Sequence, residues 1–178
     1  MLHLEMGAAF VIEAVERFGV QSFNRWNDSI ASLVPGYWTA GESEPALCVW
    51  FDLDGADLTH KRWDGISLVM ASCRGTRFDH SSLVGAEIQC GCSASFRSCD
   101  LRRASLCGDL SAADFTDAQT EGLCLDDCTY HTDCPPILLP AELLLQCRQV
   151  PMDESGGAGA TEYPVPIQAS LAKAWVPQ

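Results

Sequence analysis

A large, mostly apolar side chain recurs at every fifth position between residues 53 and 88. An α-helix repeats at about 3.6 residues and a β-strand at about two, so neither element explains this spacing. A chain that turns a corner every five residues can coil into a square solenoid, with two of each five side chains inside and three outside. The repeated positions are Leu53, Leu58, Trp63, Leu68, Cys73, Phe78, Leu83 and Ile88.

The positions two residues before these centres carry mostly small side chains, which fit the second inward slot of each five-residue unit. Lys61 departs from this pattern, and we expect its ammonium group to reach water because an unpaired buried charge is strongly unfavourable. Four units close one coil, so the run makes about four coils and, at about 4.8 Å per stacked strand, a rod about 20 Å long.

The five-residue rhythm breaks at "QCGCSAS", residues 89–95, and returns at Phe96. We interpret the break as three extra residues that bulge from one corner, where Cys90, Gly91 and Cys92 form an interaction candidate and both thiols are exposed. With that interpretation, the predicted columns of stacked side chains are Leu53/Cys73/Phe96/Phe115, Leu58/Phe78/Leu101/Thr120, Trp63/Leu83/Leu106/Leu125 and Leu68/Ile88/Leu110/Tyr130.

The units "GADLT", "GAEIQ", "AADFT" and "SCDLR" resemble those of the pentapeptide-repeat family, which read roughly Ala-Asp/Asn-Leu-x-x. The resemblance covers about residues 49 to 132, and the segment "FGVQSFNRWN" at 18–27 is similar to the lead-in of many bacterial members. It implies an all-β fold, a right-handed quadrilateral parallel β-helix whose first coil is covered by a short helix. It also makes head-to-head dimers through a C-terminal cap an expectation.

Both ends of a solenoid expose strand edges and core, so the flanking segments are expected to cap them. At the N-terminus two amphipathic helices are predicted, over 6–18 and 23–33; at the C-terminus the leucine-rich run at 139–150 is predicted to close the last coil. The predicted organisation is a helical cap at 1–47, the β-helix at 48–134, a helical cap at 135–152, and a linker and tail at 153–178.

Acidic side chains outnumber basic ones 24 to 11, which gives a formal net charge of −13. Direct binding of nucleic acid through its phosphates requires a cationic surface, so we expect a basic protein surface, or a site that normally receives DNA, as the partner. No stretch has the length of a membrane span or the basic flank of a signal peptide. We therefore expect a cytoplasmic protein whose ten cysteines are reduced thiols.

Catalytic chemistry finds little support in the sequence, and no catalytic residue or cofactor is assigned. The aspartates occupy a favoured repeat position that faces solvent, and the histidines at 60, 80 and 131 fall at outward or corner positions. Zinc-ligand residue types do occur together in "CLDDCTYHTDC", but their spacing is not that of a standard finger, and Cys128 falls in an inward slot. These metal candidates are Cys124, Cys128, His131 and Cys134.

Three functions remain open at this point. The chain is a non-catalytic protein-interaction module, an acidic DNA mimic that binds DNA gyrase or another type II topoisomerase and confers resistance or self-protection, or an accessory protein or enzyme of a biosynthetic pathway. Ile167, Leu171 and Trp175 recur at four-residue spacing in the tail. We expect the tail either to dock on its own domain or to hold a second copy or a partner. Besides the 90–92 bulge, the interaction candidates are Asp57, Asp64, Asp100, Asp114, Leu144, Leu145, Leu171 and Trp175.

Overall fold

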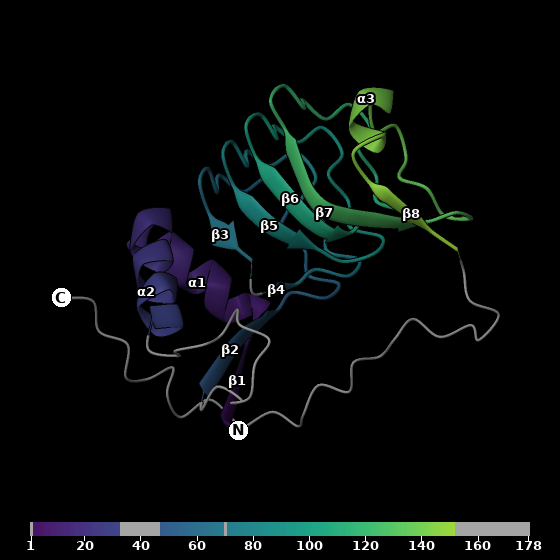
Figure 1. The fold of residues 1–178 in the computed structure, drawn as a ribbon. Coiled ribbons are helices and arrows are strands. Elements are labelled where there is room, and N and C mark those ends of the chain that lie inside the picture. Colours follow the sequence, from purple (N-terminus) through teal and green to yellow (C-terminus); the bar gives the residue numbers. More distant parts are fainter. Residues whose placement is uncertain (1, 33–46, 70, 152–178) are drawn as a thin grey trace.

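The computed structural model describes residues 2–32, 47–69 and 71–151. These residues wind into a parallel β-solenoid in which short strands stack along the axis and two helices pack at the N-terminal end (Figure 1). The predicted all-β solenoid is therefore confirmed. No helix in the described part is both long and apolar enough to cross a bilayer.

Two parallel sheets hold most of the strand pairs, with the orders β1-β2-β4 and β3-β5-β6-β7-β8. A further column consists of single bridges that join residues 57, 77, 95, 114 and 137, so the solenoid makes about five turns instead of the predicted four. The strands are β1 Leu2–Gly7, β2 Leu47–Asp52, β3 Ser67–Leu68, β4 Ala71–Ser72, β5 Glu87–Cys90, β6 Ser105–Asp109, β7 Cys124–His131 and β8 Arg148–Val150. The helices are α1 Ala8–Phe18, α2 Val20–Ser32 and α3 Ala141–Leu144.

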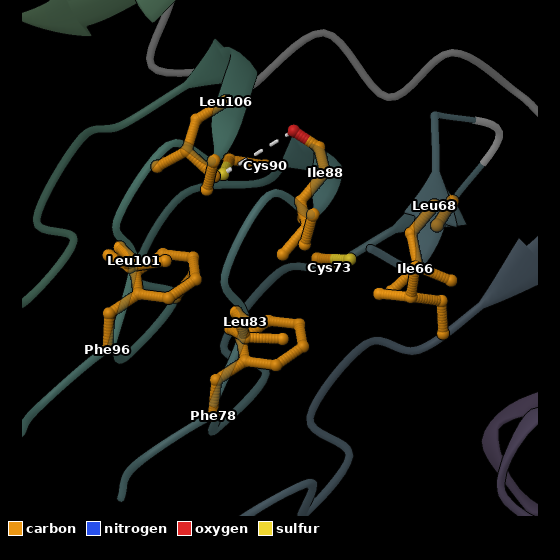
Figure 2. Close-up of a cluster of buried hydrophobic side chains, with 14 of the residues drawn as sticks. Ile66, Leu68, Cys73, Phe78, Leu83, Ile88, Cys90, Phe96, Leu101 and Leu106 are labelled. Carbon is orange, nitrogen blue, oxygen red and sulfur yellow. Dashed lines mark hydrogen bonds between the residues drawn. The ribbon is translucent and has the colours of Figure 1, made fainter. Parts of the chain in front are cut away.

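Stacked aromatic rings fill one column of the core. The ring centroids of Phe78 and Phe96 lie 5.2 Å apart, those of Phe96 and Phe115 lie 5.3 Å apart, and all three side chains are buried. Figure 2 shows Phe78 beside Phe96 and Leu83 beside Leu101. The predicted columns are correct as far as Ile88, and the predicted pairs Phe96/Phe115 and Leu106/Leu125 are confirmed. The error lies in the join between these two runs, because Phe96 stacks on Phe78 and not on Cys73.

The error comes from the interruption at residues 89–95. Asp57 lies 20 residues before its stacked partner Arg77, whereas Asp79 lies only 18 residues before Arg97 in the next coil. The coil is therefore two residues short, and the predicted three-residue bulge is wrong. β5 extends as far as Cys90, whose side chain is buried and lies beside Ile88 (Figure 2).

Two helices and a strand close the N-terminal end. α1 and α2 bury Val11 and Phe23 completely, and the Phe23 ring lies 5.4 Å from Phe51 of the first coil. Asn24 fixes α2 to a corner by donating to the Gly65 carbonyl at 2.6 Å and accepting from the backbone N–H of residue 67 at 3.0 Å. The two helices confirm the predicted elements, but β1, which pairs with β2 along its full length, was not predicted.

The C-terminal end differs from the helix predicted over residues 139–150. α3 comprises only four residues, and β8 then returns to the ladder, where it pairs with residues 129–131 of β7. The outer edge of β7 would otherwise leave backbone N–H and C=O groups without strand partners, and β8 satisfies part of them. The leucine-rich run is therefore a short helix followed by a fifth-turn strand.

Candidate interaction surface

Four aspartates that the sequence marks as interaction candidates serve the turns of the solenoid. A carboxylate that accepts a hydrogen bond from the backbone two residues later closes a corner, and three of them do so. The fourth, Asp64, accepts instead from the N–H of Val84 in the next coil at 3.2 Å. The corner bonds are Asp57 to Thr59 N at 3.1 Å, Asp100 to Arg102 N at 3.2 Å and Asp114 to Thr116 N at 2.9 Å.

Each of these four aspartates lies within ion-pair distance of an arginine. The shortest of the ion pairs joins Arg102 Nη2 to Asp100 Oδ2 at 2.6 Å, and hydrogen bonding from Arg102 lowers the pKa of the Asp100 carboxyl. Hydrogen bonds from Thr59 lower the pKa of Asp57 in the same direction. The other pairs are Arg77 to Asp57 at 3.3 Å, Arg77 to Asp79 at 3.5 Å, Arg97 to Asp114 at 3.2 Å and Arg62 to Asp64 at 3.8 Å.

The outward face of β5, β6 and β7 has a different charge balance. Glu87 on β5 and Asp126 and Asp127 on β7 are exposed, and in the described part of the chain none of them forms an ion pair. The parallel register places Glu87 and Asp126 on strands either side of β6. We define Glu87, Asp126 and Asp127 as the acidic sheet face.

Cys107 of β6 lies between these carboxylates, and their charge affects the pKa of its thiol. It pairs with Gln89 on one side and Asp126 on the other, and its side chain is half-buried. Burial is the main cause that raises the pKa of the Cys107 thiol, and Asp126, Asp127 and Glu87 raise it further. The three carboxylates therefore act on the same thiol from the strands on both sides of β6.

Small and large side chains alternate inside each five-residue unit. The small slot that precedes Phe78 holds Thr76, whose hydroxyl donates to the Leu53 carbonyl at 2.6 Å, and the slot that precedes Phe96 holds a fully buried alanine. Two inward side chains in every five, repeated over stacked parallel coils, decide the fold. The chain has the pentapeptide-repeat fold.

Comparisons with known proteins find similarity to two solved structures of pentapeptide repeat proteins. One is alr5209, a pentapeptide repeat protein from Nostoc PCC 7120, at 19% identity and a TM-score of 0.29 over 56% of this chain and 81% of that one. The other is HetL from Nostoc sp. strain PCC 7120, a pentapeptide repeat protein involved in heterocyst differentiation regulation, at 23% identity and a TM-score of 0.22 over 44% of this chain. The chain spans 42% of the length of HetL.

No family model matches the sequence, and no curated protein matches it. The fold assignment therefore comes from the stacked parallel strands and bridges of this chain itself.

The residues at the interruption are not an exposed loop. Cys90 is buried, which raises the pKa of its thiol well above the ordinary value, and Cys92 is half-buried, so the prediction of two exposed thiols is wrong. Gly91 packs against the coil below, where a Cβ would lie 2.7 Å from the backbone nitrogen of Arg74. Gly91 is therefore required for close packing between coils.

The four metal candidates do not converge. Cys124 and Cys134 are exposed, whereas Cys128 is buried and its thiol donates to the Leu106 carbonyl at 3.2 Å. Within the described ranges no group of three or more histidine, cysteine, aspartate or glutamate side chains could hold a metal ion. The inward position predicted for Cys128 is confirmed.

Two histidines stack on an exposed corner. His60 and His80 have ring centroids 5.0 Å apart and planes 9° apart, and both residues have positive φ, 57° and 60°. Their spacing of one 20-residue coil, visible in the sequence, is the signal that they stack. In the part of the chain that the structure describes, the two histidines do not belong to a group of three or more His, Cys, Asp or Glu side chains that could hold a metal ion.

The leucine candidates at the C-terminal end have opposite environments. Leu144 is half-buried against the core, whereas Leu145 is 87% exposed. Leu171 and Trp175 lie outside the described residues. Of these four candidates, only Leu145 is shown to be exposed in the described part of the chain.

Proposed function

We propose that this pentapeptide-repeat chain is a non-catalytic protein-interaction module that binds a basic surface of a partner protein through its acidic sheet face. The observation that carries the proposal is the exposure of Glu87, Asp126 and Asp127 on neighbouring strands without cation partners in the described residues. Like charges held in this way favour a partner that neutralises them, and the long-range field speeds association with that partner.

The rest of the solenoid supports the same proposal. Its interior is occupied by packed side chains, including the column of Phe78, Phe96 and Phe115, and small solenoids of this kind present their chemistry on the outside. The paired aspartates on the other faces are tied to the turns. A docking protein uses a rigid, regular surface on which part of the charge is not neutralised.

The proposal is tested by quantitative affinity capture from the extract of the source organism with three baits. The first is the full chain, the second carries Glu87→Gln, Asp126→Asn and Asp127→Asn, and the third removes the same number of charges from the N-terminal cap by Glu5→Gln, Glu13→Gln and Asp28→Asn. Asparagine tolerates the left-handed backbone of residue 127, where φ is 48°, so the sheet variant keeps its fold. We expect one protein to be retained by the first and third baits and lost from the second; equal retention by all three would refute the acidic sheet face.

A second candidate, the acidic mimic of DNA that binds a type II topoisomerase, is favoured by the same carboxylates and by the net charge of −13. It requires a basic DNA-binding groove as the partner surface. A gyrase supercoiling assay distinguishes it: inhibition by the full chain and the cap variant but not by the sheet variant supports mimicry. Undiminished supercoiling at every soluble concentration leaves another basic protein as the partner.

A further inference from the structure

Large apolar side chains are exposed at the C-terminal end of the solenoid. Ile137 is 47% exposed, Leu138 is 70% exposed and Leu145 is 87% exposed, and among the side chains whose burial the structure describes no other large apolar one has comparable exposure. All three belong to the last turn of the solenoid. We name Ile137, Leu138 and Leu145 the terminal apolar cluster, and such a concentration of exposed apolar residues indicates a contact surface.

The two ends of the solenoid are covered to different degrees. At the N-terminal end α1 and α2 leave Val11, Phe23 and Phe51 with no exposure. At the C-terminal end the cover is the four-residue α3, which contributes Leu143 to the core. The cap at this end is therefore the smaller of the two.

The segment that follows β8 begins close in sequence to Leu145 of the terminal apolar cluster. Val150 is five residues beyond Leu145, so the two lie within about 18 Å of each other along any path of the chain. The acidic and glycine-rich residues 153–162 lead to a stretch with Ile167, Leu171 and Trp175 at four-residue spacing. An unconstrained glycine-rich chain of fifteen residues has a root-mean-square span of about 20 Å, so the length of residues 152–166 is sufficient to return to Leu145.

We propose that Ile167, Leu171 and Trp175 cover the terminal apolar cluster of the same chain. A short linker holds them at an effective concentration in the millimolar range, about 1 mM, which exceeds the concentration at which a second copy competes in dilute solution. At that effective concentration, a tenfold excess of the covered state over the open state requires an intrinsic Kd of only about 0.1 mM. This intramolecular contact lies at the end of the solenoid and does not depend on the acidic sheet face.

Hydrogen exchange of α3 in the full chain tests the cluster side of the contact. The amides of Leu143, Leu144 and Leu145 donate to the carbonyls of residues 140 and 141, and these bonds open more easily when the cluster is uncovered. We expect Leu171→Asp to speed their exchange about tenfold, in line with the ratio above. Ala169→Asp, two residues away and therefore on the opposite side at helical spacing, is the control and should leave the exchange rates unchanged.

Trypsin cleavage after Lys173 tests the tail side. Leu145→Asp acts at a fully solvated side chain, so it should leave the core intact and still accelerate cleavage after Lys173 about tenfold. Gln146→Asp, at the adjacent exposed residue, should not accelerate this cleavage. Slow exchange of the amides at positions 78–115 in every variant confirms that the solenoid is folded.

Unchanged exchange in Leu171→Asp together with unchanged cleavage in Leu145→Asp would overturn the proposal. So would protection that disappears on dilution while light scattering reports a dimer at high concentration, because a second copy would then be the occupant. Protection that is independent of concentration, in a monomer, supports the intramolecular contact.

Discussion

Lys61 Nζ lies 2.6 Å from Glu16 Oε1, and this ion pair joins the first coil of the solenoid to α1. Lys61 occupies a slot that takes a small residue in most units. Its side chain bends out of that slot, and 27% of it is exposed. The departure from the repeat pattern is therefore an attachment point for the N-terminal cap.

Removing that ion pair should cost little. Both side chains are partly exposed, so Glu16→Gln is expected to lower the free energy of unfolding by no more than about 1 kcal/mol, and by less in 1 M salt. Urea unfolding at low and high salt measures this. Glu13→Gln on the same helix is the matched control, and an equal loss in both variants would show that the pair has no specific effect.

The Phe78–Phe96–Phe115 column predicts a large effect at its centre. Phe96 is fully buried, so Phe96→Ala should cost about 3–5 kcal/mol by loss of burial and creation of a cavity, whereas Phe96→Leu should cost about 1–2 kcal/mol. A double-mutant cycle should give Phe78 and Phe96 a coupling of about 0.5–1.5 kcal/mol. A stronger coupling of Phe96 to Cys73 would restore the column predicted from the sequence.

Much of this architecture can be predicted from the sequence. The part that cannot depends on the number of residues in the interrupted coil. A five-residue rhythm is restored equally well by three extra residues or by two missing ones, so "QCGCSAS" could be read in either way. Only the stacking of Phe96 on Phe78 selects the shorter coil. The same ambiguity decides whether Cys90 is an exposed thiol or part of the core.

The ends of the chain were predicted less well for a different reason. Leu2, Leu4 and Met6 alternate with polar residues, which is the signal of a strand, but the helical pattern that begins at the same place obscured it. Similarly, the leucines after residue 139 suggested a long helix, although the unpaired edge of β7 favours a strand there. The acidic sheet face could not be identified, because the pairing of arginines with the other aspartates is set by stacking between coils.

Thiol labelling tests the buried cysteines. At pH 8, Cys124 and Cys134 should react with iodoacetamide, whereas Cys73, Cys90 and Cys99 should react only after unfolding. Burial raises the pKa of Cys73 and of Cys99 to about 12, so the reactive thiolate is scarce as well as inaccessible. Peptide mapping by mass spectrometry gives the rates; labelling of Cys90 as fast as Cys124 would mean that residues 89–95 form an open loop.

The corner aspartates predict a loss of stability in acid. Hydrogen bonding from Arg102 lowers the pKa of Asp100 below its ordinary value of 3.8, and Asp114 is also lowered: burial works to raise its pKa, but hydrogen bonds from Thr116 and the charge of Arg97 outweigh it. A depressed folded-state pKa stabilises the protein above the unfolded value, and that contribution is lost as the pH falls through the folded value.

The urea midpoint should therefore be steady between pH 6 and about pH 4 and fall below it, since the ordinary carboxyl pKa lies near 4. Asp100→Asn should lower the midpoint at pH 6 and make the fall in acid smaller. Asp28→Asn, at an exposed residue of α2, is the control. A fall of the same size in Asp100→Asn and in the unsubstituted protein would exclude Asp100 as a source of the acid sensitivity.

The most direct test of the acidic sheet face is the Kd of the captured partner, measured by isothermal titration calorimetry against the three forms of the full chain. Each exposed charge contributes up to about 1 kcal/mol to such a contact, so replacing Glu87, Asp126 and Asp127 should weaken binding at least about tenfold and reduce its dependence on salt. The cap variant should bind like the unsubstituted chain. Equal Kd values for all three forms, or equal weakening in both variants, would contradict the account.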